Sequence, residues 1–199
     1  MEKNSIIHVI LTGGVGSRLW PLSRKSKPKQ YLDIFDGKSL FEMTLDRNST
    51  IADVVMVVGN IDNCHLSKAV LEKSNTEYID IIESTPRNTA AAIAFAAFAS
   101  QGEDILIVTP SDHIIGKMER YEEAMQEAIE KASKGFIVTF GIVPTKPETG
   151  YGYIEATEEY ATDDIRKAKA FKEKPDLDTA QEYLMAGNFF WNAGIFVWN

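Results

Sequence analysis

The sequence predicts an α/β fold with a doubly wound, mostly parallel sheet, and three observations lead to this prediction. Short apolar runs rich in β-branched residues alternate with helix-compatible segments across residues 6–140. Such runs are typical of parallel strands that are buried on both faces. A glycine-rich stretch directly follows the first run, at the sheet edge where these folds bind ligands. The chain has 199 residues, of which 44% are hydrophobic, and this suits one domain with a sizeable core.

The alternating part contains five predicted strands and four predicted helices. Gly59 and Gly102 are expected to end a strand and a helix, and Asn88 is a favoured residue for a helix N-terminus. The strands are predicted at residues 6–11, 53–58, 78–82, 105–109 and 136–140, and the helices at residues 39–46, 63–73, 88–100 and 121–132.

Beyond Gly141 the regular alternation of predicted strands and helices ends. Strands are predicted at residues 150–155 and 168–171, and a further apolar strand after residue 191. A short helix is expected to begin at Asp178 or Thr179, where Asp178 and Gln181 have the spacing of a capping box. The chain then stops on this apolar strand, so we expect it to be the front part of a longer protein, with Ile195 and its successors exposed at an unpaired edge.

The glycine-rich stretch has the composition of a phosphate-binding loop. Gly13, Gly14 and Gly16 can adopt positive φ and bring backbone N–H groups close to phosphate oxygens. Arg18 and Lys29 add two cations, which suits a polyphosphate. The Walker A loop is excluded because no Gly-Lys-Ser/Thr follows the glycines, and the dinucleotide fingerprint is excluded because Leu19 stands at its third glycine.

Composition excludes several classes of protein. A net charge of -8 leaves no broad basic surface for a nucleic acid. The single cysteine, Cys64, rules out an internal disulfide and a cysteine-based zinc site, and it fits a reducing cytoplasm. No leader peptide is visible, and no apolar run approaches the roughly 20 residues of a membrane helix. We therefore expect a cytoplasmic protein without membrane or nucleic-acid partners.

A carboxylate, Asp112, follows the fourth predicted strand at the ligand-binding edge. It has two interpretations, a ligand for Mg²⁺ on nucleotide phosphates or a turn cap. For His113, a capping or packing role is preferred to a role as a ligand or a base. Neither His8 nor His65 has a partner pattern that indicates catalysis.

The pattern Gly-Gly-x-Gly-x-Arg-Leu-x-Pro starts at Gly13, and Lys-Pro-Lys follows at residues 27–29. It resembles the signature of the sugar-nucleotide pyrophosphorylases, a family of nucleotidyltransferases, and residues 20–24 and 28–30 are most similar to its mannose-1-phosphate guanylyltransferase branch. Three residues depart from the family pattern: Pro86, Ala91 and Ser111 stand where Gly, Pro and Ala are usual. Further similar segments lie at residues 83–90, 110–113, 144–154, 171–175 and 192–194.

The resemblance implies a Rossmann-like fold and a set of roles. Mg²⁺ would be held by Asp112, which with Arg18 and Lys29 forms the implied catalytic group. From the residues alone, Asn88 would be interpreted as an N-cap and residues 172–174 as a solvated strand edge. The implied nucleotide-binding residues are Leu11, Gly13, Gly14, Gly16, Ser17, Arg18, Lys29, Asn88 and Ser111. The implied sugar-phosphate-binding residues are Gly150, Glu173, Lys174 and Asn192.

The implied reaction is mannose-1-phosphate guanylyltransfer, in which GTP and mannose 1-phosphate give GDP-mannose and pyrophosphate. The rivals are a thymidylyl- or uridylyltransferase and a non-catalytic nucleotide-sugar-binding homologue. We expect a nucleotide half at about residues 1–141 and a sugar-binding part at about residues 142–199 that continues past the end. We also expect nucleotide binding without catalysis by these 199 residues, because the family's second metal-binding Asp would lie further on. The sequence is compatible with a homo-oligomer and with a further isomerase domain in the longer protein.

Overall fold

The computed structural model describes residues 5–14, 19–33, 37–74, 76–85, 88–158 and 165–199. The chain forms two compact units. The first contains the residues up to Val138 together with Phe196–Asn199, and the second is Thr139–Ile195. β8 (Phe189–Trp198) begins in the second unit and ends in the first.

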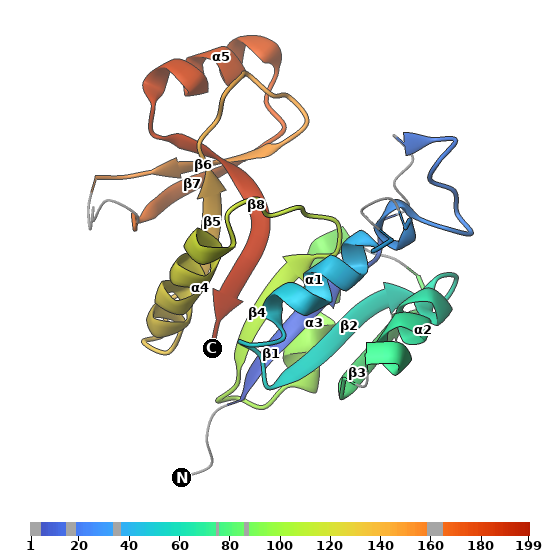
Figure 1. Ribbon diagram of the computed structural model, residues 1–199. Helices are drawn as coiled ribbons and strands as arrows, with labels where there is room; N and C mark the ends of the chain where they lie inside the picture. The colour runs from blue at the N-terminus through green and yellow to red at the C-terminus, as the bar shows by residue number, and fades with distance from the viewer. Residues whose placement is uncertain (1–4, 15–18, 34–36, 75, 86–87, 159–164) are drawn as a thin grey trace. The chain divides into compact units, whose positions relative to one another are not determined.

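The first unit is built on four parallel strands (Figure 1). Their order is β3 (Tyr78–Glu83), β2 (Val54–Asn60), β1 (Ile6–Leu11) and β4 (Ile105–Pro110). The last residues of β8 pair antiparallel with β4. The predicted α/β fold with a mostly parallel sheet is therefore confirmed, and β1 stands at its centre because its run of β-branched residues is buried on both sides.

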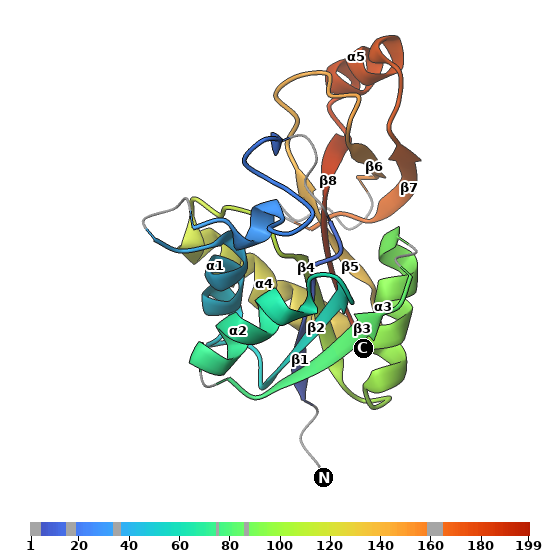
Figure 2. The same cartoon turned by 90° about the vertical axis from the view of Figure 1, so that its right-hand side faces the viewer.

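Helices cover both faces of this sheet (Figure 2). On one face α3 (Asn88–Ala99) packs its small Ala92 and Ala96 against β1, β2 and β4. On the other face β1 and β2 pack against α1 (Leu40–Asn48) and α2 (Cys64–Ser74). α4 (Met118–Ala132) lies on the α1 side, where Tyr121 bonds to Asn48. Successive residues of each strand thus pack into the cores on opposite faces of the sheet, as the two-residue repeat of a β-strand requires.

Local signals explain where α1 starts. Ser39 accepts a hydrogen bond from the Glu42 backbone, and the Glu42 carboxylate accepts one from the Ser39 backbone at 2.7 Å. This reciprocal pair satisfies two backbone donors that the first helical turn leaves unpaired. Upstream, Lys29–Tyr31 forms the short 3-10 helix η2, which delivers Lys29 and Gln30 to the strand ends.

In its described residues, the second unit has an antiparallel sheet and one helix. β6 (Gly152–Ala156) lies between β7 (Ala168–Glu173) and the first part of β8. β5 (Val138–Ile142) also pairs with β8. The position of the fifth predicted strand is right, but its place among the parallel strands is wrong, because its partner comes from 50 residues later in the chain.

The predicted cap of the last helix is wrong by two residues. α5 (Leu177–Ala186) is capped by Asp176, whose carboxylate accepts a hydrogen bond from the Thr179 backbone at 2.8 Å, so Asp178 lies inside the first turn. Both aspartates are acceptable caps by sequence, and the one with extended backbone takes the role.

The expected exposure of the last strand is also wrong. Ile195 and Val197 are 4% and 0% exposed, because β8 pairs with β4 and closes that edge of the parallel strands. Within the part of the chain that the structure describes, no helix has the length and apolarity needed to span a membrane.

Candidate functional site

The first unit gathers polar groups at the carboxyl ends of its parallel strands. Thr12 donates its backbone N–H to the Val58 carbonyl at 2.9 Å, and Ser111 donates its own to the Leu11 carbonyl at 3.2 Å. The strand order therefore continues one residue past β1 and β4, and Gly13 and Asp112 each directly follow these last bonded residues. This is the edge where doubly wound folds bind ligands.

Gln30 fixes the beginning of the glycine loop. Its side-chain amide donates to the Thr12 carbonyl at 2.8 Å and to the Gly14 carbonyl at 3.1 Å. The side chain is 1% exposed, so both bonds are shielded from water. Gly13 and Gly14 themselves are exposed. Gln30 was not predicted from the sequence, since its partners are backbone groups 16 and 18 residues away.

Lys29 and Asp112 form an ion pair at the same edge. Their side chains are 32% and 23% exposed, so the pair is open to a ligand and partly shielded from solvent. A single accessible carboxylate fits Mg²⁺, which binds one or two carboxylates together with substrate phosphates. Among the described residues no group of three or more His, Cys, Asp or Glu gathers as a closed metal cage. Lys29 and Asp112, which the sequence analysis assigns to the phosphate and the metal, are thus in contact.

Glu83 ends β3 and is a second feature that the sequence analysis missed. It is 6% exposed, and its Oε1 has no hydrogen-bond partner among the described residues. A methyl group built on Gly13 would lie 3.9 Å from Glu83 Oε2. A buried carboxylate with an unused oxygen therefore lies beside the glycine loop. A polar residue at the end of an otherwise apolar strand is the signal that could have identified it.

A buried polar chain runs behind Asp112, between β1, β4, α1 and α4. The Tyr121 hydroxyl donates to Asn48 Oδ1 at 2.8 Å, and the Asn48 amide donates to His8 Nε2 at 3.0 Å. Thr109 Oγ1 lies 2.8 Å from the same ring nitrogen. The other ring nitrogen, His8 Nδ1, is buried and has no hydrogen-bond partner among the described residues.

Burial lowers the pKa of His8 to about 3, with a smaller contribution from the Arg47 charge. The folded state therefore binds fewer protons than the unfolded state once the pH falls below about 6.5. We expect stability to be unaffected by His8 above that pH and to fall below it, by about 2 kcal/mol between pH 7 and pH 5. An NMR titration of the ring should show no protonation above pH 4, and a midpoint near 6.5 would contradict this.

The second unit places Glu173 and Asn192 on the two strands that flank β6. Register pairs Gly152 with Glu173 of β7, and the next residue, Tyr153, pairs with Trp191 of β8, which Asn192 follows. A side chain at Gly152 would come within 2.9 Å of Glu173 Oε2. Asn192 Oδ1 accepts a hydrogen bond from the Gly194 backbone at 3.0 Å. Phe171 Cζ lies 2.7 Å from the position of a Gly152 Cβ, so an aromatic ring also covers this glycine.

Lys174 and Gly150 lie in the same unit. Lys174 has a positive φ of 44° and donates its ammonium to Glu173 Oε1 at 2.5 Å. Both side chains are more than half exposed, so the ion pair is available to a ligand. The Gly150 backbone donates to Glu148 Oε1 at 3.1 Å.

The remaining predicted residues belong to the first unit. Asn88 is exposed and begins α3 with a positive φ of 68°, a conformation that Asn tolerates better than most residues. Ser111 is buried, and its backbone joins β4 to β1 as described above. Gly16, Ser17 and Arg18 lie outside the described residues.

A family model described as nucleotidyl transferase matches residues 7–199. The chain belongs to this family. It is 39% identical over 200 residues to mannose-1-phosphate guanylyltransferase RfbM of Salmonella typhimurium, covering 97% of this chain and 42% of that protein. It is 40% identical over 199 residues to the xanthan biosynthesis protein XanB of Xanthomonas campestris, covering 98% of this chain and 42% of that protein.

A solved structure agrees with these relatives. The crystal structure of mannose-6-phosphate isomerase from Helicobacter pylori aligns with a TM-score of 0.83 and 39% identity, covering 98% of this chain and 70% of that one. The nucleotidyl transferase family assignment therefore rests on sequence and fold together. The chain spans about 42% of the length of the curated relatives it matches.

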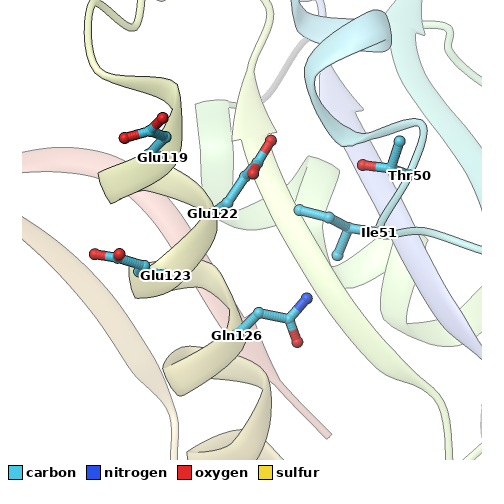
Figure 3. A pocket seen from close by; sticks show the side chains of 6 residues that line it. All are labelled: Thr50, Ile51, Glu119, Glu122, Glu123 and Gln126. Carbon is cyan, nitrogen blue, oxygen red and sulfur yellow. The ribbon is translucent and has the colours of Figure 1, made fainter.

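A separate hollow lies beside α4 and is unsuited to the phosphates of a nucleotidyl transferase substrate (Figure 3). Its α4 wall carries three glutamates, which would repel phosphate, and its other wall precedes β2, at the opposite end of the parallel strands from Asp112. The lining residues are Thr50, Ile51, Glu119, Glu122, Glu123 and Gln126.

Proposed function

We propose that the protein transfers GMP from GTP to α-D-mannose 1-phosphate in a Mg²⁺-dependent reaction that gives GDP-mannose and pyrophosphate. The observation that carries the proposal is the ion pair of Lys29 and Asp112, next to Gln30, whose side chain bonds to the Thr12 and Gly14 carbonyls of the glycine loop. The identity of about 40% to curated guanylyltransferases over nearly the whole chain supports it. The substrates are cytoplasmic metabolites, so we expect the reaction to take place in the cytoplasm.

The chemistry requires charge neutralisation and positioning more than a covalent nucleophile. A phosphate oxygen of the sugar phosphate attacks the α-phosphorus of GTP in line, and pyrophosphate leaves. Lys29 and Arg18 neutralise the triphosphate and the leaving pyrophosphate, while exposed backbone groups of Gly13 and Gly14 face its oxygens. Asp112 would hold Mg²⁺, which would supply positive charge to offset the negative charge of the reacting phosphates.

The Lys29–Asp112 ion pair has a consequence for the order of these contacts. The Asp112 carboxylate is already paired with one cation, the Lys29 ammonium. A metal–triphosphate complex would offer a partner to each residue, with phosphate oxygens for Lys29 and a cation for Asp112. The residues therefore fit a metal–nucleotide complex better than a free metal ion.

Guanine is the base that best fits Glu83. Its Watson–Crick edge presents two adjacent donors, N1–H and the N2 amino group, and a carboxylate offers two acceptor oxygens. Glu83 has an oxygen without a partner and lies beside the loop on which the nucleotide would sit. Uracil and thymine offer one donor on this edge, so the same carboxylate favours them less.

The sugar half of the proposal rests on Glu173, Lys174 and Asn192. Glu173→Gln removes the charge but keeps the shape, so mannose 1-phosphate should bind at least 10-fold more weakly while GTP affinity changes little. Calorimetric titration of each ligand into the whole protein measures this. Glu155→Gln, on the neighbouring β6, is the matched control. Equal losses for both ligands would mean that Glu173 acts on the fold.

A panel of nucleotides and sugar 1-phosphates tests the proposal. Each of GTP, ATP, UTP, CTP and dTTP is incubated with mannose 1-phosphate or glucose 1-phosphate, and pyrophosphate release is measured with and without Mg²⁺. We expect GTP with mannose 1-phosphate to give the highest kcat/KM. A preference for UTP or dTTP with glucose 1-phosphate would favour the rival transferases, and binding without pyrophosphate release would favour a non-catalytic homologue.

A further inference from the structure

Arg47 is a buried cation directly behind the candidate metal ligand. It lies in the last turn of α1 and is 7% exposed. Its guanidinium donates to the His113 carbonyl at 3.1 Å and to Thr44 Oγ1 at 3.1 Å. It also lies over the Tyr121 ring, 5.4 Å from the ring centroid.

None of these partners is an acid. Among the described residues no carboxylate lies within ion-pair distance of Arg47, and its buried Nε has no hydrogen-bond partner. Burial without a counter-ion is unfavourable for a cation, so stability alone does not account for an arginine here. An apolar side chain of similar length would fill the same space at lower cost.

The contact with His113 gives this cation a role. His113 immediately follows Asp112, and the hydrogen bond to its carbonyl holds the peptide that follows His113, one residue beyond the Asp112 peptide. Thr109 precedes Asp112 in the chain, and its hydroxyl contacts His8, which in turn bonds to Asn48. Asn48 is the neighbour of Arg47 in α1. The last turn of α1 therefore contacts the chain near the end of β4, through His8, and just after Asp112, through the His113 carbonyl.

We propose that Arg47 is a positioning residue that fixes the Asp112 carboxylate, through the His113 carbonyl, in the orientation needed to receive a metal-bound triphosphate. The inference rests on the proposed function for the role of Asp112 and adds a residue that touches neither metal nor nucleotide. Residues that orient a metal ligand typically change metal affinity 10- to 100-fold when they are replaced.

The test is the affinity of the whole protein for Mn²⁺ in the presence of GTP, measured from the EPR signal of free Mn²⁺. Arg47→Met should weaken Mn²⁺ binding at least about 10-fold, while Arg47→Lys, which keeps a donor for the His113 carbonyl, should restore most of it. If Arg47→Met does not fold, Arg47→Gln replaces it, with the same direction of change expected. Thermal unfolding of every variant is recorded alongside.

Thr44→Val is the matched control because it removes the other Arg47 acceptor and leaves the bond to His113. It should lower thermal stability without changing Mn²⁺ affinity. An equal loss of Mn²⁺ affinity in Thr44→Val and Arg47→Met, or none in Arg47→Met, would overturn the role of Arg47. Retention of Mn²⁺ affinity by Asp112→Asn would instead overturn the metal assignment itself, and the inference with it.

Discussion

Replacing Lys29 with methionine should slow turnover of the whole protein at least about 100-fold, the scale for losing one preorganised charge contact to a reacting group. The ammonium lies beside Asp112 at the strand ends and is one-third exposed, so its loss removes a phosphate contact and little packing. The free energy of unfolding should change by no more than about 0.5 kcal/mol. Steady-state kinetics and urea unfolding measure the two effects separately.

Lys27→Met is the matched control for this experiment. Lys27 lies two residues earlier and pairs with the exposed Asp33 at 3.0 Å, away from Asp112. Its replacement should leave turnover within about twofold of wild type, since an isolated exposed pair contributes little. Near-normal turnover of Lys29→Met, or an equal loss in Lys27→Met, would contradict the assignment of Lys29 to the triphosphate.

Replacing Glu83 with glutamine should reduce GTP affinity about 10- to 100-fold, because hydrogen bonds to a charged group contribute about 1.5–3 kcal/mol. The amide replaces one acceptor with a donor, which then faces a donor of guanine. Binding of UTP or ATP should change much less, so the preference for GTP falls. Competition titrations with a fluorescent guanine nucleotide measure all three affinities.

Asp80→Asn provides the control on the same strand. Asp80 also carries a buried oxygen without a partner, but it lies three residues before the end of β3. Burial raises the pKa of Asp80, so the amide is expected to be tolerated. Equal losses for GTP, UTP and ATP in Glu83→Gln would assign Glu83 to the fold and not to the base.

The sequence was sufficient for those parts of the fold that local patterns determine. β-branched runs located β1 and β4, and residues 39–46 were predicted as a helix, close to the observed α1. Lys29 was identified from its residue type and its place after the glycine loop, while the family resemblance favoured Asp112 as a metal ligand over a turn cap, and the structure brings the two side chains into contact. In each case the signal lies within a few residues, or follows from the rule that parallel strands end at one edge.

Features that depend on distant partners could not be predicted in this way. β5 was placed with the parallel strands because alternation is local, whereas its pairing with β8 is decided by residues that come much later. Gln30, Glu83 and Arg47 are functional candidates only because folding buries them against backbone groups and loops far away in sequence. No local pattern separates a buried glutamine or arginine from an exposed one.

The proposal that the carboxyl ends of β1, β3 and β4 form a metal-dependent guanine-nucleotide site can be tested directly by equilibrium titration. GTP is titrated into the protein with Mg²⁺ and with EDTA, and the titrations are repeated for Asp112→Asn. The proposal has three quantitative consequences. It predicts micromolar or tighter binding of GTP with Mg²⁺, at least about 10-fold weaker binding in EDTA, and no effect of EDTA on Asp112→Asn. Binding of GTP that is equally tight with and without metal in the wild-type protein would contradict it.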